Sequence, residues 1–164
     1  MKLKISLYLL ISLVFLLNTA MSCDEKEGGE PIVITITGIE LYNINNEGQG
    51  PVISDEPIKK EAYLIGIRYV YVIEENEETI EYYYRIGGDI KSEQIVSNVD
   101  IGEEYPAGSD ISGLFTKTPF APQPLDYAFV LRKSIPAGTY SFKVILTTNK
   151  DKVIEVSTNP IELY

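Results

Sequence analysis

The sequence predicts an all-β protein, an antiparallel β-sandwich of about seven or more short strands. Runs in which apolar and polar residues alternate recur from residue 32 to the end of the chain, and this period of two places successive side chains on opposite faces of a strand. Clusters of Pro, Gly and Asn separate these runs, as they do at turns between strands. No stretch beyond residue 31 sustains the period of a helix.

The first half of the domain contains four alternating runs. Residues 32–37 alternate with β-branched side chains, and residues 39–42 alternate again. Residues 63–73 give the longest strand signal, because their odd positions form a continuous apolar face. Residues 79–86 alternate as well, and the acidic run 74–78 lies between these last two strands. We therefore expect a hairpin with an acidic tip.

The second half repeats the pattern. Large apolar residues alternate through 125–131, and a Pro-Ala-Gly turn within 134–138 leads into the next predicted strand. In that strand, residues 140–146, the even positions carry large apolar side chains and are expected to face inward. After an Asn-Lys-Asp turn, residues 153–156 and 161–164 complete the predicted domain.

The N-terminal segment is built like a bacterial secretion signal. Lys2 and Lys4 give it a positive start, residues 7–17 are apolar except for Ser12, and Cys23 follows as the only cysteine of the chain. The apolar run is shorter than the roughly 20 residues that span a bilayer, which disfavours a transmembrane anchor. An ordinary secretory signal followed by an incidental cysteine is the other alternative. One thiol cannot close an internal disulfide, so the domain must be stabilised by burial.

Residues 19–23, Thr-Ala-Met-Ser-Cys, resemble the lipobox of bacterial lipoproteins, in the relaxed form common among the Bacteroidota. Alanine stands where most lipoboxes carry leucine. The resemblance implies that residues 1–22 are a cleaved signal peptide and that Cys23 carries the lipid. Residues 23–31 are then a lipidated acidic tether, and residues 32–164 form the β-sandwich domain.

The acidic run after the cysteine resembles the surface-export signal of Bacteroidota lipoproteins. It implies an outer-membrane protein that faces the cell exterior, with the periplasmic face as the alternative. The mature part keeps all 24 acidic residues and loses Lys2 and Lys4 from the 14 basic ones, so its formal charge is 12 minus 24, or −12. This charge repels phosphate backbones, so we expect no nucleic-acid partner. We expect one monomeric domain, held at the membrane by its N-terminal lipid.

Residues 136–144, Pro-Ala-Gly-Thr-Tyr-Ser-Phe-Lys-Val, resemble the penultimate-strand region of bacterial immunoglobulin-like domains. The likeness covers residues 125–163 and implies an immunoglobulin-like β-sandwich. By this resemblance Tyr140 occupies a tyrosine-corner-like position, with its hydroxyl bonded to nearby backbone. The whole chain resembles small Bacteroidota lipoproteins with one such domain, a family that supplies no catalytic or binding residue for this chain.

The residue types present restrict the chemistry. The chain has no histidine, which excludes Ser-His-Asp and Cys-His catalysis and any histidine-bearing zinc site. It also has no glycine-rich phosphate loop. We therefore expect no enzymatic activity and no cofactor. The oxygen-rich runs 43–48 and 100–104, the latter with Asp110, could contact calcium, but neither completes the spacing of a calcium loop, so we expect solvated turns and no metal.

The segment 97–124 is the candidate binding surface. Its prolines and glycines predict a long irregular connection, and such connections in compact domains usually carry function. It contains Leu114, Phe115 and Phe120, apolar side chains that a loop can leave accessible. Tyr83 is a further candidate, because it faces away from its tyrosine neighbours and can stack on a sugar ring or anchor a partner. Burial of both faces of the sheet is the alternative.

Two function classes remain. The first is a lipid-anchored, non-catalytic binding or accessory module that presents this surface to a glycan or an envelope protein. The alternative is a structural or fimbria-associated envelope subunit that assembles by strand-edge pairing. Fimbrial lipoproteins of the Bacteroidota are usually matured by cleavage after an arginine beyond the cysteine. The first arginine here is Arg68, inside a predicted central strand, so the binding module is favoured.

Overall fold

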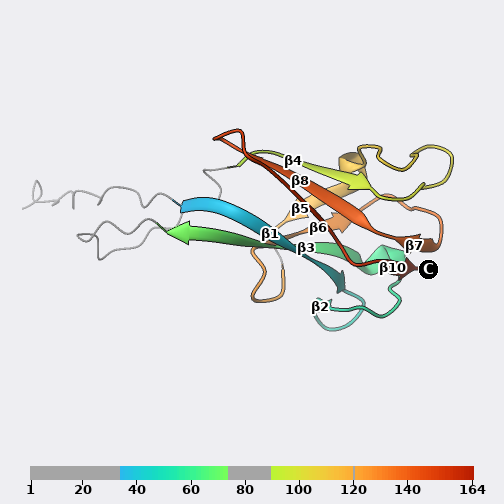
Figure 1. The fold of residues 1–164 in the computed structure, drawn as a ribbon. Helices are drawn as coiled ribbons and strands as arrows, with labels where there is room; N and C mark the ends of the chain where they lie inside the picture. Colours follow the sequence, from blue (N-terminus) through green and yellow to red (C-terminus); the bar gives the residue numbers. More distant parts are fainter. Residues whose placement is uncertain (1–33, 74–89, 120) are drawn as a thin grey trace, which may run out of the picture. The chain divides into compact units, whose positions relative to one another are not determined.

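The computed structural model describes residues 34–73, 90–119 and 121–164, which belong to one compact unit of the chain (Figure 1). The predicted signal peptide and tether, with Cys23, lie outside the described residues, as does the predicted strand 79–86. Within the described ranges, the structure contains no helix with the length and apolar character needed to cross a membrane.

Ten strands and two short 3-10 helices are described. In chain order they are β1 (Ile34–Asn45), β2 (Val52–Ile53), η1 (Lys60–Ala62), β3 (Tyr63–Ile73), β4 (Ile90–Ser97), η3 (Ser112–Leu114), β5 (Phe115–Thr118), β6 (Tyr127–Leu131), β7 (Gly138–Tyr140), β8 (Phe142–Thr148), β9 (Val153–Ser157) and β10 (Ile161–Leu163). Each 3-10 helix has three residues. The prediction of an all-β fold is confirmed for this part of the chain.

The strands form antiparallel sheets that pack as layers. The largest sheet has the order β2-β1-β3-β6-β5, another has the order β4-β8-β9, and β10 pairs with β7. All pairings between these strands are antiparallel. Figure 1 shows β4 and β8 lying over the pair of β1 and β3. One core joins the two layers, since it contains Ile65 and Ile67 of β3 together with Phe142 and Val144 of β8.

β3 is the middle strand of the largest sheet, and its alternation divides its side chains between two environments. Tyr63 and Ile67 are completely buried between the layers, as the period of two predicts. On the other face, Gly66 lies beneath Ile44 and Leu125, which belong to a second small apolar cluster. A Cβ atom on Gly66 would lie 2.5 Å from the nearest Cδ1 atom of each. The absence of a side chain at this position lets the 121–126 segment cover the sheet.

Two loops lie at one end of the domain. β1 begins at Ile34, which pairs with Ile73 at the end of β3. At the opposite end β3 begins at Tyr63, and Ser97 at the end of β4 pairs with Phe142 at the start of β8. The loop that follows β4 and the loop that precedes β7 therefore both leave the sandwich at the end opposite to the start of β1 (Figure 1).

The segment 97–124 is more regular than predicted. It contains η3 and β5, and β5 pairs along its length with β6. Its earlier part is bonded to β4, because the Gly108 N–H donates to the Ser97 carbonyl oxygen and the Ile111 N–H donates to the Ile95 carbonyl oxygen, both over 2.8 Å. The prediction of a long irregular connection is therefore wrong for these parts. The hydrogen-bonding partners lie in other strands, where local composition does not reveal them.

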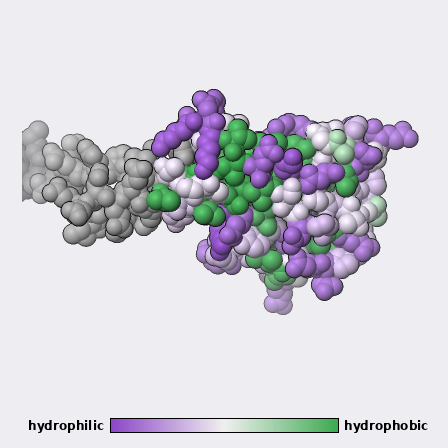
Figure 2. Space-filling view, viewed as in Figure 1, coloured by the Kyte–Doolittle hydropathy of each residue, from purple (hydrophilic) through white to green (hydrophobic). Residues whose placement is uncertain are grey.

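The two ends of the domain differ in surface character. Figure 2 shows apolar residues gathered mainly toward the end where β1 begins. Toward that end of β3, Val70, Tyr71 and Val72 are exposed to 42%, 39% and 54%. The end that carries the two loops is more polar in this view. Two large apolar side chains of those loops, Ile101 and Ile135, are buried instead.

Candidate pocket at the loop end of the sandwich

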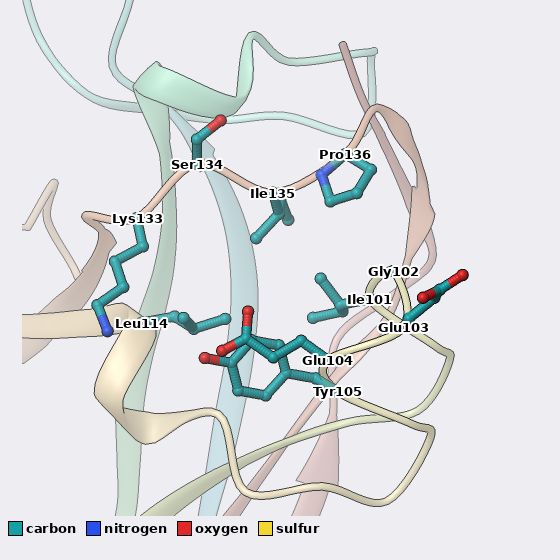
Figure 3. Close-up of a pocket in the computed structure, with 10 residues that line it drawn as sticks. All are labelled: Ile101, Gly102, Glu103, Glu104, Tyr105, Leu114, Lys133, Ser134, Ile135 and Pro136. Carbon is teal, nitrogen blue, oxygen red and sulfur yellow. The ribbon is translucent and has the colours of Figure 1, made fainter.

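A pocket of about 510 Å³ opens at the loop end of the domain (Figure 3). Its two walls are residues 101–105, which follow β4, and residues 133–136, which precede β7. Three apolar side chains form its floor, namely Ile101, Leu114 and Ile135, and they are exposed to only 3%, 3% and 4%. Figure 3 shows Ile101 and Ile135 pointing toward each other between the walls. The two loops thus enclose a hollow of mixed polarity that is open to solvent.

Local hydrogen bonds fix the loop after β4. The Ile101 N–H donates to the Tyr105 carbonyl oxygen over 2.8 Å, which closes a short turn. Gly102 within this turn has a φ of +61°, a left-handed conformation that glycine adopts without steric cost. The Asp100 carboxylate accepts a hydrogen bond from the Ala107 N–H over 2.7 Å. Because Ile101 is also buried in the core, this wall is preorganised.

The facing wall is fixed by backbone contacts and by one tyrosine. The N–H groups of Arg132 and Lys133 both donate to the Leu114 carbonyl oxygen, over 2.8 and 3.4 Å. The Tyr140 hydroxyl donates to the Pro136 carbonyl oxygen over 2.8 Å. The prediction that this hydroxyl bonds nearby backbone is confirmed. This hydrogen bond ties the wall to β7.

Polar groups and an aromatic ring stand at the rim. Figure 3 shows Glu104 and Tyr105 side by side on one wall and Lys133 and Ser134 on the other, while Glu103 points away from the pocket. A hydrogen bond to the Glu104 carboxylate raises the pKa of Tyr105 above its usual value. The hydroxyl therefore stays protonated at neutral pH. The rim thus offers hydrogen-bond donors, a carboxylate acceptor and a flat apolar ring above an apolar floor.

A smaller pocket of about 290 Å³ adjoins the first one. It is lined by Lys60 and Glu61 of η1 and by residues 131–134. Lys133 and Ser134 line both pockets, so the two hollows share a wall. Three of the six lining residues of the smaller pocket are basic, which gives it a cationic character that the first pocket lacks.

The predicted contact residues of the 97–124 segment do not stand free on the surface. Leu114 is part of the pocket floor. Phe115 is 9% exposed, and its ring lies 5.6 Å from that of Phe142 in an edge-to-face contact within the core. Besides Leu114, the segment reaches the pocket through residues 101–105, which overlap the oxygen-rich run 100–104 that was expected to form a solvated turn.

The predicted tyrosine face is mostly buried in the part of the chain that the structure describes. Tyr83 and Phe120 lie outside the described residues. Of the two other tyrosines in the middle and end of β3, Tyr69 is 7% exposed and Tyr71 is 39% exposed. Tyr71 lies near the end of β3 that is opposite to the pocket. Of these two tyrosines of β3, Tyr71 is therefore the one that remains open to a partner.

Glu93 organises a polar cluster away from the pocket. Its Oε1 atom accepts a hydrogen bond from the Tyr127 hydroxyl and lies 3.5 Å from the Tyr69 hydroxyl oxygen. The Lys117 Nζ atom lies 2.7 Å from Glu93 Oε2 and 3.8 Å from the centroid of the Tyr127 ring. Burial raises the pKa of Tyr127 far above its usual value. Since these side chains are hydrogen-bonded or ion-paired to one another, the cluster stabilises the fold and does not present a free reactive group.

The oxygen-rich runs are occupied by structural contacts. Asn43 is buried in β1, where its side chain donates to the Asn159 carbonyl oxygen over 3.1 Å and accepts from the Tyr63 hydroxyl over 2.8 Å. The first part of that run is therefore strand and not the solvated turn expected. Asp100 and Asp110 each accept a hydrogen bond from a backbone N–H. Among the described residues, no group of three or more Asp, Glu or Cys side chains is placed to hold a metal ion.

Sequence reasoning missed the second wall of the pocket. Residues 133–136 have the composition of a turn, and nothing in their pattern indicates a ligand. The adjacent basic pair Arg132 and Lys133, in a chain of net charge −10, is the one signal that could have drawn attention to this wall. No protein-family model, curated protein or solved structure matches the chain.

Proposed function

We propose that this chain is a lipid-anchored protein of the cell envelope and that its β-sandwich, of the immunoglobulin-like type, binds a saccharide as a non-catalytic binding or accessory module. The observation that carries the proposal is the preformed pocket between residues 101–105 and 133–136, with Tyr105 at its rim. Its volume of about 510 Å³ lies within the range of roughly 300–1,000 Å³ that is usual for small-molecule sites.

The composition of the pocket suits a sugar ring. A sugar presents apolar C–H faces and a belt of hydroxyl groups, so it needs an apolar contact beside both donors and acceptors. Tyr105 offers the flat ring, and the floor formed by Ile101 and Ile135 offers further apolar contact. Glu104 can accept hydrogen bonds from sugar hydroxyls, and Ser134 can donate or accept them.

The position of the pocket suits a membrane-anchored binding protein. Lipid on Cys23 would attach the chain at its N-terminal side, where β1 is the first element of the domain. The pocket lies at the end of the sandwich opposite to the start of β1. A tether that joins the domain at β1 would therefore be attached at the end opposite to the pocket. On the outer membrane this arrangement presents the pocket to the cell exterior, and the periplasmic face is the alternative.

A concave pocket favours a saccharide over an envelope protein as the ligand. Stable protein interfaces bury about 1,600 Å² and cover broad, fairly flat surfaces. The feature of this end of the domain is a hollow with a buried floor, which a sugar ring can enter. Protein binding at the loop end would instead depend on residues outside the hollow.

The alternative function, a structural subunit that assembles by strand-edge pairing, has one observation in its favour. β9 is an edge strand of its sheet, and Val153 at its start is 55% exposed. Maturation by cleavage after Arg68 would have to break β3, whose residue 68 pairs with Glu40 of β1, and it would remove β1 from the sheet. The binding module therefore remains our proposal, and we expect a monomer.

Replacing Tyr105 with alanine should weaken saccharide binding by about tenfold or more, because the variant loses the aromatic contact at the rim. Binding of the full-length chain in detergent to polygalacturonate, dextran sulfate and dextran can be measured by isothermal titration calorimetry. Tyr71→Ala is the matched control, since it removes an exposed tyrosine far from the pocket. Loss of binding in Tyr71→Ala, with Tyr105→Ala unchanged, would move the site to the opposite end of β3.

A further inference from the structure

Most basic side chains of the described residues have a partner. Five of them form ion pairs with carboxylates, namely Lys59, Arg68, Lys91, Lys117 and Lys143. Lys150 and Lys152 donate to oxygen atoms of Thr35 and Thr37. Three others, Lys60, Arg132 and Lys133, have neither an ion pair nor a side-chain hydrogen bond to any described residue.

These three unpaired cations line one pocket. Lys60 comes from η1, whereas Arg132 and Lys133 follow β6, and all three border the hollow of about 290 Å³. The contacts between η1 and β6 bring together residues that are far apart in the sequence. Glu61 is the one acidic residue that lines this pocket, so the lining keeps an excess of positive charge. In a chain of net charge −10, such an excess at one place is a specific feature of the surface.

An anionic group would supply a charge partner for these cations. A bound carboxylate or sulfate attracts positively charged side chains that line one pocket. The Arg132 guanidinium can bind two oxygens of such a group at once, and Lys60 and Lys133 can each donate to the remaining oxygens. A neutral ligand would leave all three cations without partners.

We propose that the saccharide bound by this protein is anionic, and that Lys60, Arg132 and Lys133 bind its carboxylate or sulfate group. This inference rests on the proposed function, because the cationic pocket shares Lys133 and Ser134 with the saccharide pocket. A sugar ring beside Tyr105 can place a charged substituent, or the charge of the next residue of the polymer, over the cationic pocket. The ligand class is therefore an acidic polysaccharide, either a uronate or a sulfated glycan.

The test compares three polymers and two triple variants of the full-length chain. Polygalacturonate carries carboxylates, dextran sulfate carries sulfates, and dextran is neutral. Replacement of Lys60, Arg132 and Lys133 by alanine should weaken binding to the preferred acidic polymer by at least about tenfold. The control replaces Lys143, Lys150 and Lys152 by alanine, which removes the same formal charge from the region of β8 and β9. That variant should bind within about twofold of the wild type.

Each outcome of this test bears on the proposal. The proposal is supported if the wild type binds an acidic polymer more tightly than dextran, and if this preference is lost in the pocket triple variant but kept in the control. The preferred polymer then shows whether the bound group is a carboxylate or a sulfate. Binding of dextran by the wild type as tightly as of the acidic polymers, with all three affinities unchanged in the pocket triple variant, overturns the inference but leaves saccharide binding intact. Absence of binding to all three polymers overturns both proposals. Equal losses of affinity in the two triple variants would show that binding depends on the net charge of the protein and not on this pocket, which overturns the inference. If the pocket triple variant does not fold, the affinities of the single variant Arg132→Gln for the three polymers are compared with those of the wild type instead.

Discussion

Replacing Phe142 with alanine should lower the free energy of unfolding by about 3–5 kcal/mol, the usual cost of deleting a fully buried phenylalanine. The side chain is 0% exposed and lies where the two layers meet. Its ring centroid lies 5.5 Å from that of Tyr63, 5.6 Å from that of Phe115 and 5.9 Å from that of Tyr140. Removal of the ring would leave a cavity between the sheets, and with one thiol in the chain no internal disulfide can compensate.

Chemical denaturation followed by circular dichroism measures this effect. Phe142→Leu should cost less, because leucine keeps much of the buried apolar volume. Val153→Ala is the exposed control on the edge strand β9, and it should change stability by no more than about 0.5 kcal/mol. Equal stability of Phe142→Ala and the wild type would contradict the packing of the two sheets around this residue.

Replacing Cys23 with serine should release the protein from the membrane and abolish fatty-acid labelling. The chain has no other cysteine, so no second thiol can accept the lipid. Each buried methylene of an acyl chain contributes about 0.8 kcal/mol to membrane attachment, so loss of the whole lipid changes the partition almost completely. Membrane fractionation together with labelling by a fatty-acid analogue measures both effects.

Ser22→Ala is the matched control for Cys23, because it changes the neighbouring residue and keeps the thiol. It should remain labelled and sediment with membranes. Two results together would contradict lipidation: the Cys23→Ser variant still sediments with membranes, and the wild type takes up no fatty acid. They would show that an ordinary secretion signal is followed by an incidental cysteine.

The strands with strong alternation could be predicted from sequence because burial on one face imposes a period of two. Residues 63–73 and 140–146 are the clearest cases, and the inward positions Phe142, Val144 and Leu146 are each 0% exposed. The hydrogen bond of the Tyr140 hydroxyl to nearby backbone was implied by the resemblance of residues 136–144 to immunoglobulin-like domains, and its acceptor is the Pro136 carbonyl oxygen four residues away.

Features that depend on distant partners could not be predicted. β5 is a four-residue strand that ends directly before a proline, and it is defined by its pairing with β6 rather than by its own pattern. Phe115 therefore seemed to belong to a loop, although it packs in the core. The pocket has the same origin, because residues 101–105 and 133–136 are brought together by the arrangement of β4, β6 and β8. The sequence of either loop does not indicate that the other loop lies beside it.

The central claim is that the ligand occupies the pocket at the loop end of the sandwich, and NMR titration of the isotope-labelled chain with short galacturonate oligomers tests it most directly. Backbone amide shifts should concentrate at residues 101–105 and 132–135 and at Lys60, with little change along β9 or near Tyr71. Shifts confined to β9 or to the end of β3 near Tyr71, with the loop end unchanged, would contradict the account.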